Sequence, residues 1–273
     1  MKGITTALPL LIFASCIYSK ETIYTASTPA SSLVREFLGI SMTDSIDFIR
    51  WKLSINDRIY SLECNYGIGK PNTNGFYNGG KKVYVQGTVK KERNYFTLQN
   101  STKKIKLLEI NSTLLHVLND DNSLMIGNGG RSYTINRLTS ASSDQLNYIV
   151  PQTHLKDSMA FQGSTPCGIP NASKSHLCYK LKWYLVLYGD AGKNEPLTYR
   201  VYGTGFRLEA GRRGKWKIIA GKDGRTIYEL LDESGKPLFN LIRLDEGILI
   251  FTDEKGNLLV GDHDFSYTLN RKF

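Results

Sequence analysis

The chain has 273 residues, 41% of them hydrophobic and 22% charged, and a formal net charge of +10. This composition is that of an ordinary globular protein and excludes a disordered or collagen-like chain. The positive charge does not predict nucleic-acid binding, because Lys and Arg are interspersed with Asp and Glu in both halves instead of forming one basic cluster.

The N-terminal residues have the anatomy of a signal peptide. Lys2 is followed by a mainly apolar stretch over residues 4–13, which is too short to span a bilayer as a helix. The motif FASC at residues 13–16 resembles the lipobox of bacterial lipoproteins. We therefore expect a signal peptide over residues 1–15 and a lipidated Cys16 that anchors the mature chain in a membrane. The alternative is an ordinary secretory signal that is cleaved nearby.

The rest of the chain contains one sequence pattern twice. Residues 107–137 align without a gap with residues 241–271, and both segments end in Ser-Tyr-Thr-x-Asn-Arg. Upstream, Trp51 aligns with Trp183, and the FLG of residues 37–39 aligns with the FQG of residues 161–163. An internal repeat of this kind indicates two copies of one structural unit. It predicts an N-terminal tether over residues 16–33, a first repeat over 34–138, a Ser-rich linker over 139–157 and a second repeat over 158–272.

Each repeat contains short segments in which apolar and polar residues alternate. Apolar side chains recur at positions 183, 185 and 187 and again at 265, 267 and 269, the pattern of strands with one buried face. Turn-forming clusters such as residues 232–235 and 253–257 separate these segments. We predict an all-β fold of two tandem small antiparallel β-barrels. Each would be a meander of seven or eight strands, and closure would remove the exposed strand edges.

No motif for catalysis is found, so we expect a non-enzymatic protein. The four His are scattered, and the chain has no HExxH, P-loop or GxSxG motif. The sequence Asp262-His263-Asp264 could bind a metal, but neighbouring residues of a strand point to opposite faces, so a polar turn is the favoured interpretation.

The Cys residues leave two interpretations open. Cys167 and Cys178 enclose one loop ahead of a predicted strand. In an oxidising compartment they would form a disulfide. As thiolates they would form a soft site for Cu(I) or Zn(II), with His176 or Met159 as further ligands. Cys64 has no aligned Cys in the second repeat, and we expect it to be a buried free thiol.

The second repeat resembles the N-terminal domain of the NlpE-like copper-homeostasis lipoproteins. The resemblance rests on FQGSTPCGI at residues 161–169, an alternating strand from Leu181, Thr198-Tyr199, GKW at 214–216 and LIFTDEKG at 249–256. It implies a lipid anchor at the outer membrane, a lipocalin-like β-barrel and a role in copper tolerance and envelope-stress signalling. The Cys-x-x-Cys of that family is replaced here by the more widely spaced Cys167 and Cys178, so copper binding could persist only in the second repeat.

Three functions are therefore expected of a protein lipid-anchored in the bacterial cell envelope. The first is copper homeostasis or envelope-stress sensing. The second is a metal-independent interaction with an envelope protein partner. The third is the carriage of a small apolar ligand, because barrels of about eight strands can hold one.

Overall fold

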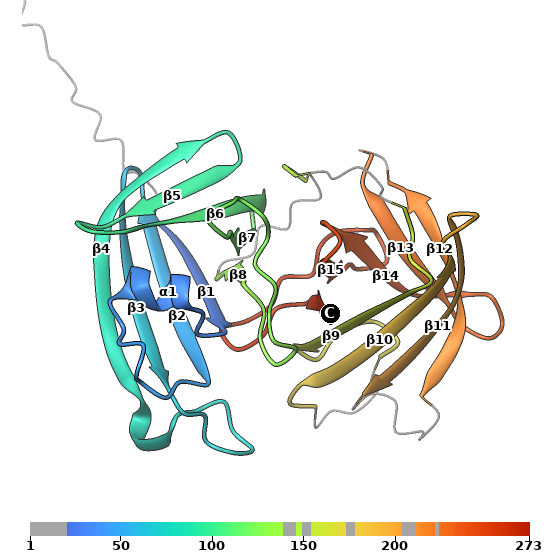
Figure 1. Ribbon diagram of the computed structural model, residues 1–273, viewed down its shortest axis with the longest axis horizontal. Helices are drawn as coiled ribbons and strands as arrows, with labels where there is room; N and C mark the ends of the chain where they lie inside the picture. The colour runs from blue at the N-terminus through green and yellow to red at the C-terminus, as the bar shows by residue number, and fades with distance from the viewer. Residues whose placement is uncertain (1–20, 139–145, 149–153, 173–177, 204–210, 222–223) are drawn as a thin grey trace, which may run out of the picture.

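The protein folds into two closed antiparallel β-barrels that lie side by side (Figure 1). The computed structural model describes residues 21–138, 146–148, 154–172, 178–203, 211–221 and 224–273. The all-β fold and the two tandem barrels predicted from the sequence are confirmed, and each barrel has eight strands.

Barrel one contains the first eight strands and two short helical segments. In chain order these are β1 (Thr22–Thr28), α1 (Ser32–Leu38), β2 (Phe48–Asn56), β3 (Ile59–Gly67), the 3-10 turn η1 (Tyr77–Gly79), β4 (Lys81–Glu92), β5 (Tyr95–Gln99), β6 (Lys104–Asn111), β7 (Leu114–Val117) and β8 (Thr134–Arg137). Each strand pairs with the next one along the chain, and β1 pairs with β8 to close the barrel.

Barrel two repeats this order of eight strands. Its elements are β9 (Ser158–Thr165), β10 (Leu181–Asp190), β11 (Glu195–Gly203), β12 (Arg212–Ala220), β13 (Thr226–Leu231), β14 (Pro237–Arg243), β15 (Ile248–Phe251) and β16 (Thr268–Arg271). Strands β9 and β16 pair to close it.

The predicted start of the first repeat is wrong. The segment predicted as a tether over residues 16–33 contains β1 and the beginning of α1. Closure pairs Tyr24 with Arg137 in barrel one and Phe161 with Arg271 in barrel two, so Phe161 corresponds to Tyr24. Phe37, which the sequence alignment matched with Phe161, lies in α1 instead. The first repeat therefore includes residue 22, because β1 is needed to close the barrel.

Each barrel has its own apolar core. Inward-facing side chains fill barrel one around Trp51 and barrel two around Trp183. Both Trp rings are held in the same way: the indole N–H of Trp51 donates to Thr28 Oγ1 at 2.9 Å, and that of Trp183 donates to Thr165 Oγ1 at 2.8 Å. An eight-stranded barrel is just wide enough for side chains to fill, and they do so here.

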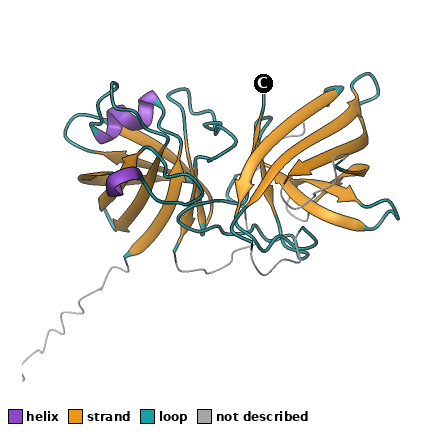
Figure 2. Ribbon diagram, turned by 90° about the horizontal axis from the view of Figure 1, so that it is seen from below, coloured by secondary structure: helices purple, strands orange, loops and turns teal. Residues whose placement is uncertain are grey.

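A cap between the first and second strands covers one end of each barrel. In barrel one the cap is α1, which buries Val34, Phe37 and Leu38 and is the longer of the two purple segments in Figure 2. Its N-cap Ser31 accepts a hydrogen bond from the Val34 N–H, and Gly39 ends the helix at φ 69°. In barrel two the equivalent position holds the loop that contains Cys167 and Cys178.

Predicted turns in barrel two owe their shape to aspartate side chains. Asp232 Oδ1 accepts hydrogen bonds from the backbone N–H groups of Ser234 and Lys236. Asp253 Oδ1 does the same for Lys255 and Asn257. These local bonds fix tight hairpins and set the register of the flanking strands.

Candidate functional site

The cap of barrel two contains the two cysteines singled out in the sequence. Cys167 and Cys178 form a disulfide, with their Cα atoms 6.0 Å apart. Both residues are half-buried. As a disulfide these sulfurs offer no thiolate to a metal ion, because metal binding requires the deprotonated, reduced form.

The disulfide loop is packed onto the open end of the barrel. Ile169 and Ala172 are buried in the core of barrel two, and Cys178 packs against it. The Tyr267 hydroxyl donates to the Cys167 carbonyl at 2.7 Å, and burial raises the pKa of Tyr267 to about 12, so the hydroxyl stays a neutral donor. The equivalent Tyr133 is hydrogen-bonded to Ser31, the N-cap of α1. The tyrosine shared by the two repeat endings thus anchors the cap of each barrel.

A cavity of about 250 Å³ adjoins this loop. Ile169, Pro170 and Asn171 line one side, and residues of β14 and β15 line the other. The cavity therefore lies between the cap and the wall of the barrel.

Of the further metal ligands predicted from the sequence, Met159 does not lie beside the disulfide. Met159 lies near the start of β9 and is buried in the core, whereas Cys167 follows the end of that strand. At 3.3 Å per residue, the six steps from Met159 to Thr165 alone separate the two ends by about 20 Å. The structure therefore does not bring Met159 together with Cys167. His176 and Cys16 lie outside the described residues.

The two barrels meet at an interface that has an apolar part and a polar part. Apolar residues of β6 and β7 pack against those of β14 and β15 in a shared core, and Figure 1 shows these strands facing each other. The main members of this shared core are Leu108, Ile110, Leu114 and Leu124 from barrel one and Ile242, Leu244, Ile248 and Leu258 from barrel two. These residues are equivalent in the two repeats, so the interface has pseudo-two-fold symmetry.

The repeated Ser-Tyr-Thr-x-Asn-Arg endings supply the polar part of this interface. Ser132 Oγ lies 2.6 Å from Ser266 Oγ, and Thr268 Oγ1 donates to Thr134 Oγ1 at 2.9 Å. Reciprocal bonds run between strand and loop: Asn270 Oδ1 accepts from the Gly127 N–H at 2.7 Å, and Asn136 Oδ1 accepts from the Gly261 N–H at 2.9 Å. Each residue thus meets its own counterpart or the reciprocal partner, as in a symmetric dimer.

Sequence reasoning missed this interface. The alternation at positions 265–270 correctly placed Tyr267 and Leu269 on a buried face. It also predicted an exposed polar face, whereas Ser266, Thr268 and Asn270 are buried against barrel one. The sequence did contain a signal for the interface, namely that these polar residues are identical in both repeats. Identity at these positions is informative because a solvent-facing strand position rarely requires a particular residue.

His116 extends the polar interface within barrel one. It is fully buried, with Nε2 2.9 Å from the Met125 carbonyl and Nδ1 3.0 Å from Thr134 Oγ1. Since a carbonyl only accepts, Nε2 carries the proton and Nδ1 accepts from the Thr134 hydroxyl. Burial lowers the pKa of His116 to about 4.

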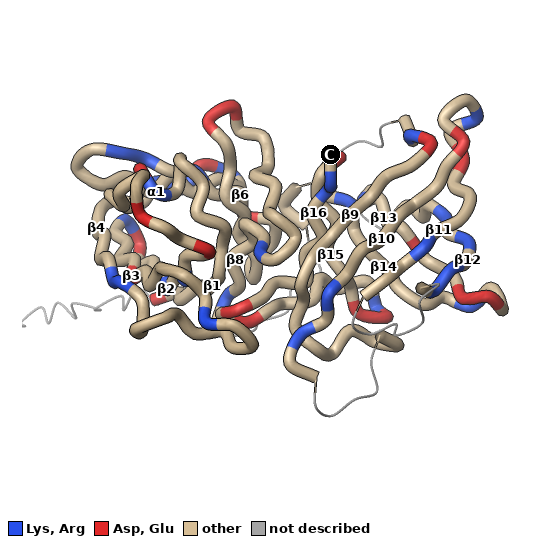
Figure 3. The backbone as a smooth tube through the Cα atoms, turned by 60° about the horizontal axis from the view of Figure 1, so that its bottom comes forward, with Lys and Arg blue, Asp and Glu red and all other residues tan. Residues whose placement is uncertain are grey.

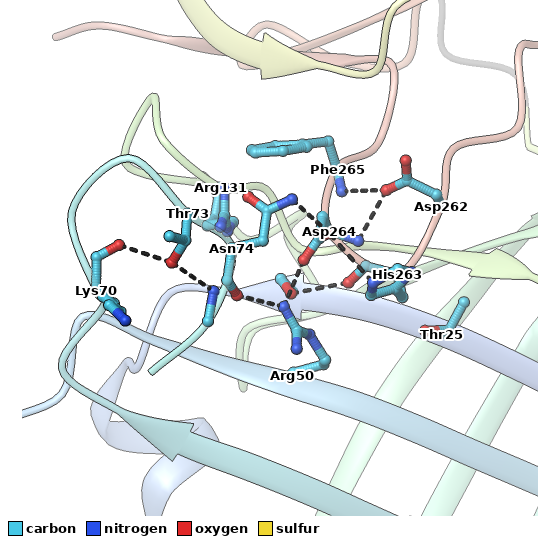
Figure 4. A network of polar contacts seen from close by, with 12 residues as sticks. Thr25, Arg50, Lys70, Thr73, Asn74, Arg131, Asp262, His263, Asp264 and Phe265 are labelled. Atoms are coloured by element: carbon cyan, nitrogen blue, oxygen red, sulfur yellow. Dashed lines mark hydrogen bonds and ion pairs between the residues drawn. The ribbon is translucent and has the colours of Figure 1, made fainter. Parts of the chain in front are cut away.

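The Asp262-His263-Asp264 sequence forms a polar turn at the edge of the interface (Figure 4). Asp262 Oδ1 accepts from the backbone N–H groups of Asp264 and Phe265. The carboxylate of Asp264 pairs with Arg50 of barrel one at 2.5 Å and accepts from Asn74 Nδ2 at 2.5 Å. These bonds engage the carboxylates, in agreement with the turn favoured from the sequence.

Cys64 is fully buried in the core of barrel one and is a free thiol, as expected. Burial raises its pKa, so it is a thiol rather than a thiolate.

Lys and Arg are mixed with Asp and Glu over both barrels (Figure 3).

Searches of protein-family models, of curated proteins and of solved structures found no match. Among the residues that the structure describes, no helix combines the length and apolar character needed to cross a membrane.

Proposed function

We propose that this chain is a lipid-anchored protein of the bacterial cell envelope that acts by binding a partner protein and does so without a metal. The observation that carries this proposal is the Cys167–Cys178 disulfide, which closes the barrel-two cap and leaves no thiolate for copper. The filled barrel interiors weigh against the carrier of a small apolar ligand. The lipobox motif that ends at Cys16 supports the anchor, with the outer membrane as its location.

A second candidate function is copper homeostasis, as in the NlpE-like lipoproteins. The paired half-buried sulfurs of the cap favour it, because reduction of the disulfide would leave two soft ligands close together. Copper binding would then be restricted to the reduced protein, and His176 remains a candidate further ligand.

One experiment separates the two functions. The full chain is reduced and titrated with Cu(I) against a competing chelator, beside the double variant Cys167→Ser, Cys178→Ser. The metal-independent function predicts equal copper uptake by both proteins. Stoichiometric uptake by the reduced wild type that is lost in the double variant would establish the copper site instead.

The anchor is tested separately. Cys16→Ser should convert a protein that pellets with membranes into a soluble or uncleaved one, and the wild-type N-terminal peptide should carry the mass of a lipid modification. Unchanged fractionation with an unmodified peptide would contradict the lipid anchor.

A further inference from the structure

The pseudo-two-fold axis produces two related polar sites, one on each side. On the first side, the turn of residues 262–265 in barrel two approaches barrel one, where the Ser27 hydroxyl donates to the His263 carbonyl at 2.8 Å. On the second side, the turn of residues 128–131 in barrel one approaches barrel two, where the Ser164 hydroxyl donates to the Gly129 carbonyl at 3.5 Å. The two turns are built alike, because Asn128 Oδ1 accepts from the backbone of Gly130 and Arg131 as Asp262 does in its own turn.

The first site contains its own anion. Asp264 reaches across the interface, and its carboxylate lies 2.5 Å from Arg50 Nη2. Arg50 directly precedes Trp51 on β2, and the corresponding residue before Trp183 on β10 is Lys182. Both sites therefore place a cation of the second strand opposite the turn of the other barrel.

The second site has a glycine in place of the aspartate. Gly130 corresponds to Asp264, so this turn supplies no carboxylate. A cavity of about 490 Å³ lies here, between residues of both barrels. Its volume is within the range of small-molecule sites.

The cavity walls carry more positive than negative charge. Arg131, Lys180 and Lys182 line it, against the single carboxylate of Asp47, which already accepts from the Gly69 N–H at 2.7 Å. The Arg131 guanidinium is fixed between the rings of Phe48 and Phe265, at 4.6 and 4.2 Å from their centroids.

The pKa of Lys180 is lowered by burial first and then by repulsion from Arg131 and Lys182, whereas the Asp264 carboxylate raises it. An anion bound among the three cations would relieve this repulsion.

Aromatic side chains complete the walls, namely Phe48 and Tyr184. We propose that this cavity, here called the carboxylate site, binds a small organic acid with an apolar body, whose carboxylate replaces the Asp264 carboxylate of the other side and pairs with Lys180 and Lys182. The apolar body lies against the aromatic walls. This inference is independent of the proposed function, since it rests on neither the anchor nor the disulfide.

The test uses calorimetric titration of the full chain with benzoate, which carries a carboxylate on an apolar ring. Acetate lacks the ring and inorganic phosphate lacks the carboxylate. We expect benzoate to bind with a Kd of about 1 mM or tighter, and at least about threefold more tightly than acetate or phosphate. Absence of benzoate binding at that level, or tighter binding of phosphate, would overturn the proposal.

The variant Gly130→Asp reproduces the first site in the second. A Cβ at Gly130 meets only Asn128 Oδ1, at 3.5 Å, so the aspartate fits the turn. We expect its carboxylate to occupy the carboxylate site and to weaken benzoate binding at least about tenfold, with an unchanged or higher melting temperature. Wild-type affinity in this variant would contradict the assignment.

Charge removal supplies the matched comparison. Lys180→Gln and Lys182→Gln each remove the positive charge and keep a polar side chain, and each should weaken benzoate binding by about threefold or more. Lys215→Gln removes an exposed cation on β12 of the same barrel and should leave the affinity unchanged. Equal losses in all three variants would mean that benzoate responds to net charge alone, and the proposal would fail.

Discussion

At the scale of single residues, His116 makes stability depend on pH. Its pKa is about 4 in the folded protein, whereas an exposed His titrates near 6.5. The unfolded chain therefore binds the proton first as the pH falls. The contribution of His116 to stability is complete above pH 6.5 and is lost progressively between about 6.5 and 4.

This dependence can be measured against a variant taken from the other repeat. Ile250 occupies the position of His116 in barrel two, so His116→Ile replaces the imidazole by the side chain that the equivalent site accommodates. Urea unfolding at pH 7 and pH 4 should show the wild type losing about 3 kcal/mol more than the variant over this interval. Parallel pH profiles would contradict a neutral buried His116.

The Trp–Thr hydrogen bond of each barrel gives a second prediction at this scale. Thr165→Val keeps the shape of the side chain but leaves the buried indole N–H of Trp183 without its acceptor. We expect the free energy of unfolding to fall by about 1–3 kcal/mol. Thr165→Ser retains the hydroxyl and should lose less. A Val variant as stable as the wild type would show that the indole N–H finds another partner.

At the scale of elements, the two caps stabilise their barrels by different means. The α1 cap relies on buried side chains and helix capping, whereas the barrel-two cap relies on a covalent link. In the chain-entropy estimate, closing a loop of this length stabilises by roughly 3 kcal/mol.

Reduction should therefore affect one barrel selectively. In Cys167→Ser, Cys178→Ser, we expect faster amide hydrogen exchange in the barrel-two cap and the adjoining ends of β9 and β10. The α1 cap should exchange at the wild-type rate, because it contains no Cys. Equal acceleration in both caps would mean that the disulfide acts on the whole protein instead of on its own loop.

Strand alternation predicted the elements better than their boundaries. The segment around Trp183 alternates strictly between buried and exposed or half-buried residues, so β10 was predictable. Strand β1 was missed because Phe37 in α1 and Gly39 directly after it have the spacing of Phe161 and Gly163 in β9, and the alignment matched those residues instead. The interface was unpredictable from periodicity, since polar residues that pair with their counterparts have the same pattern as solvent-facing ones.

At the scale of the whole molecule, each barrel has its own core and shares a third one with its neighbour. We expect residues 154–273 to fold alone, since the core of barrel two is complete within them. The exposed interface would then be apolar, and because it already matches an equivalent surface, the fragment should form a two-fold homodimer.

Analytical ultracentrifugation of this fragment tests the expectation. Ile242→Lys places a charge in the shared core without touching the core of barrel two, so the variant fragment should be a folded monomer. A wild-type fragment that remains monomeric at all concentrations would contradict the prediction. A fragment that stays disordered would show that the shared core is required for folding.

The covalent joining of the two repeats has a consequence for how the interface responds to dilution. Separate barrels would associate in a bimolecular equilibrium, and a weak contact would dissociate at low abundance. In one chain the same contact forms at an effective concentration of order mM, set by the connecting segment. The chain can therefore retain an interface of modest affinity however few copies are present. Within one chain the two repeats can also differ in sequence. One side of the axis therefore has Asp264 where the other side has Gly130.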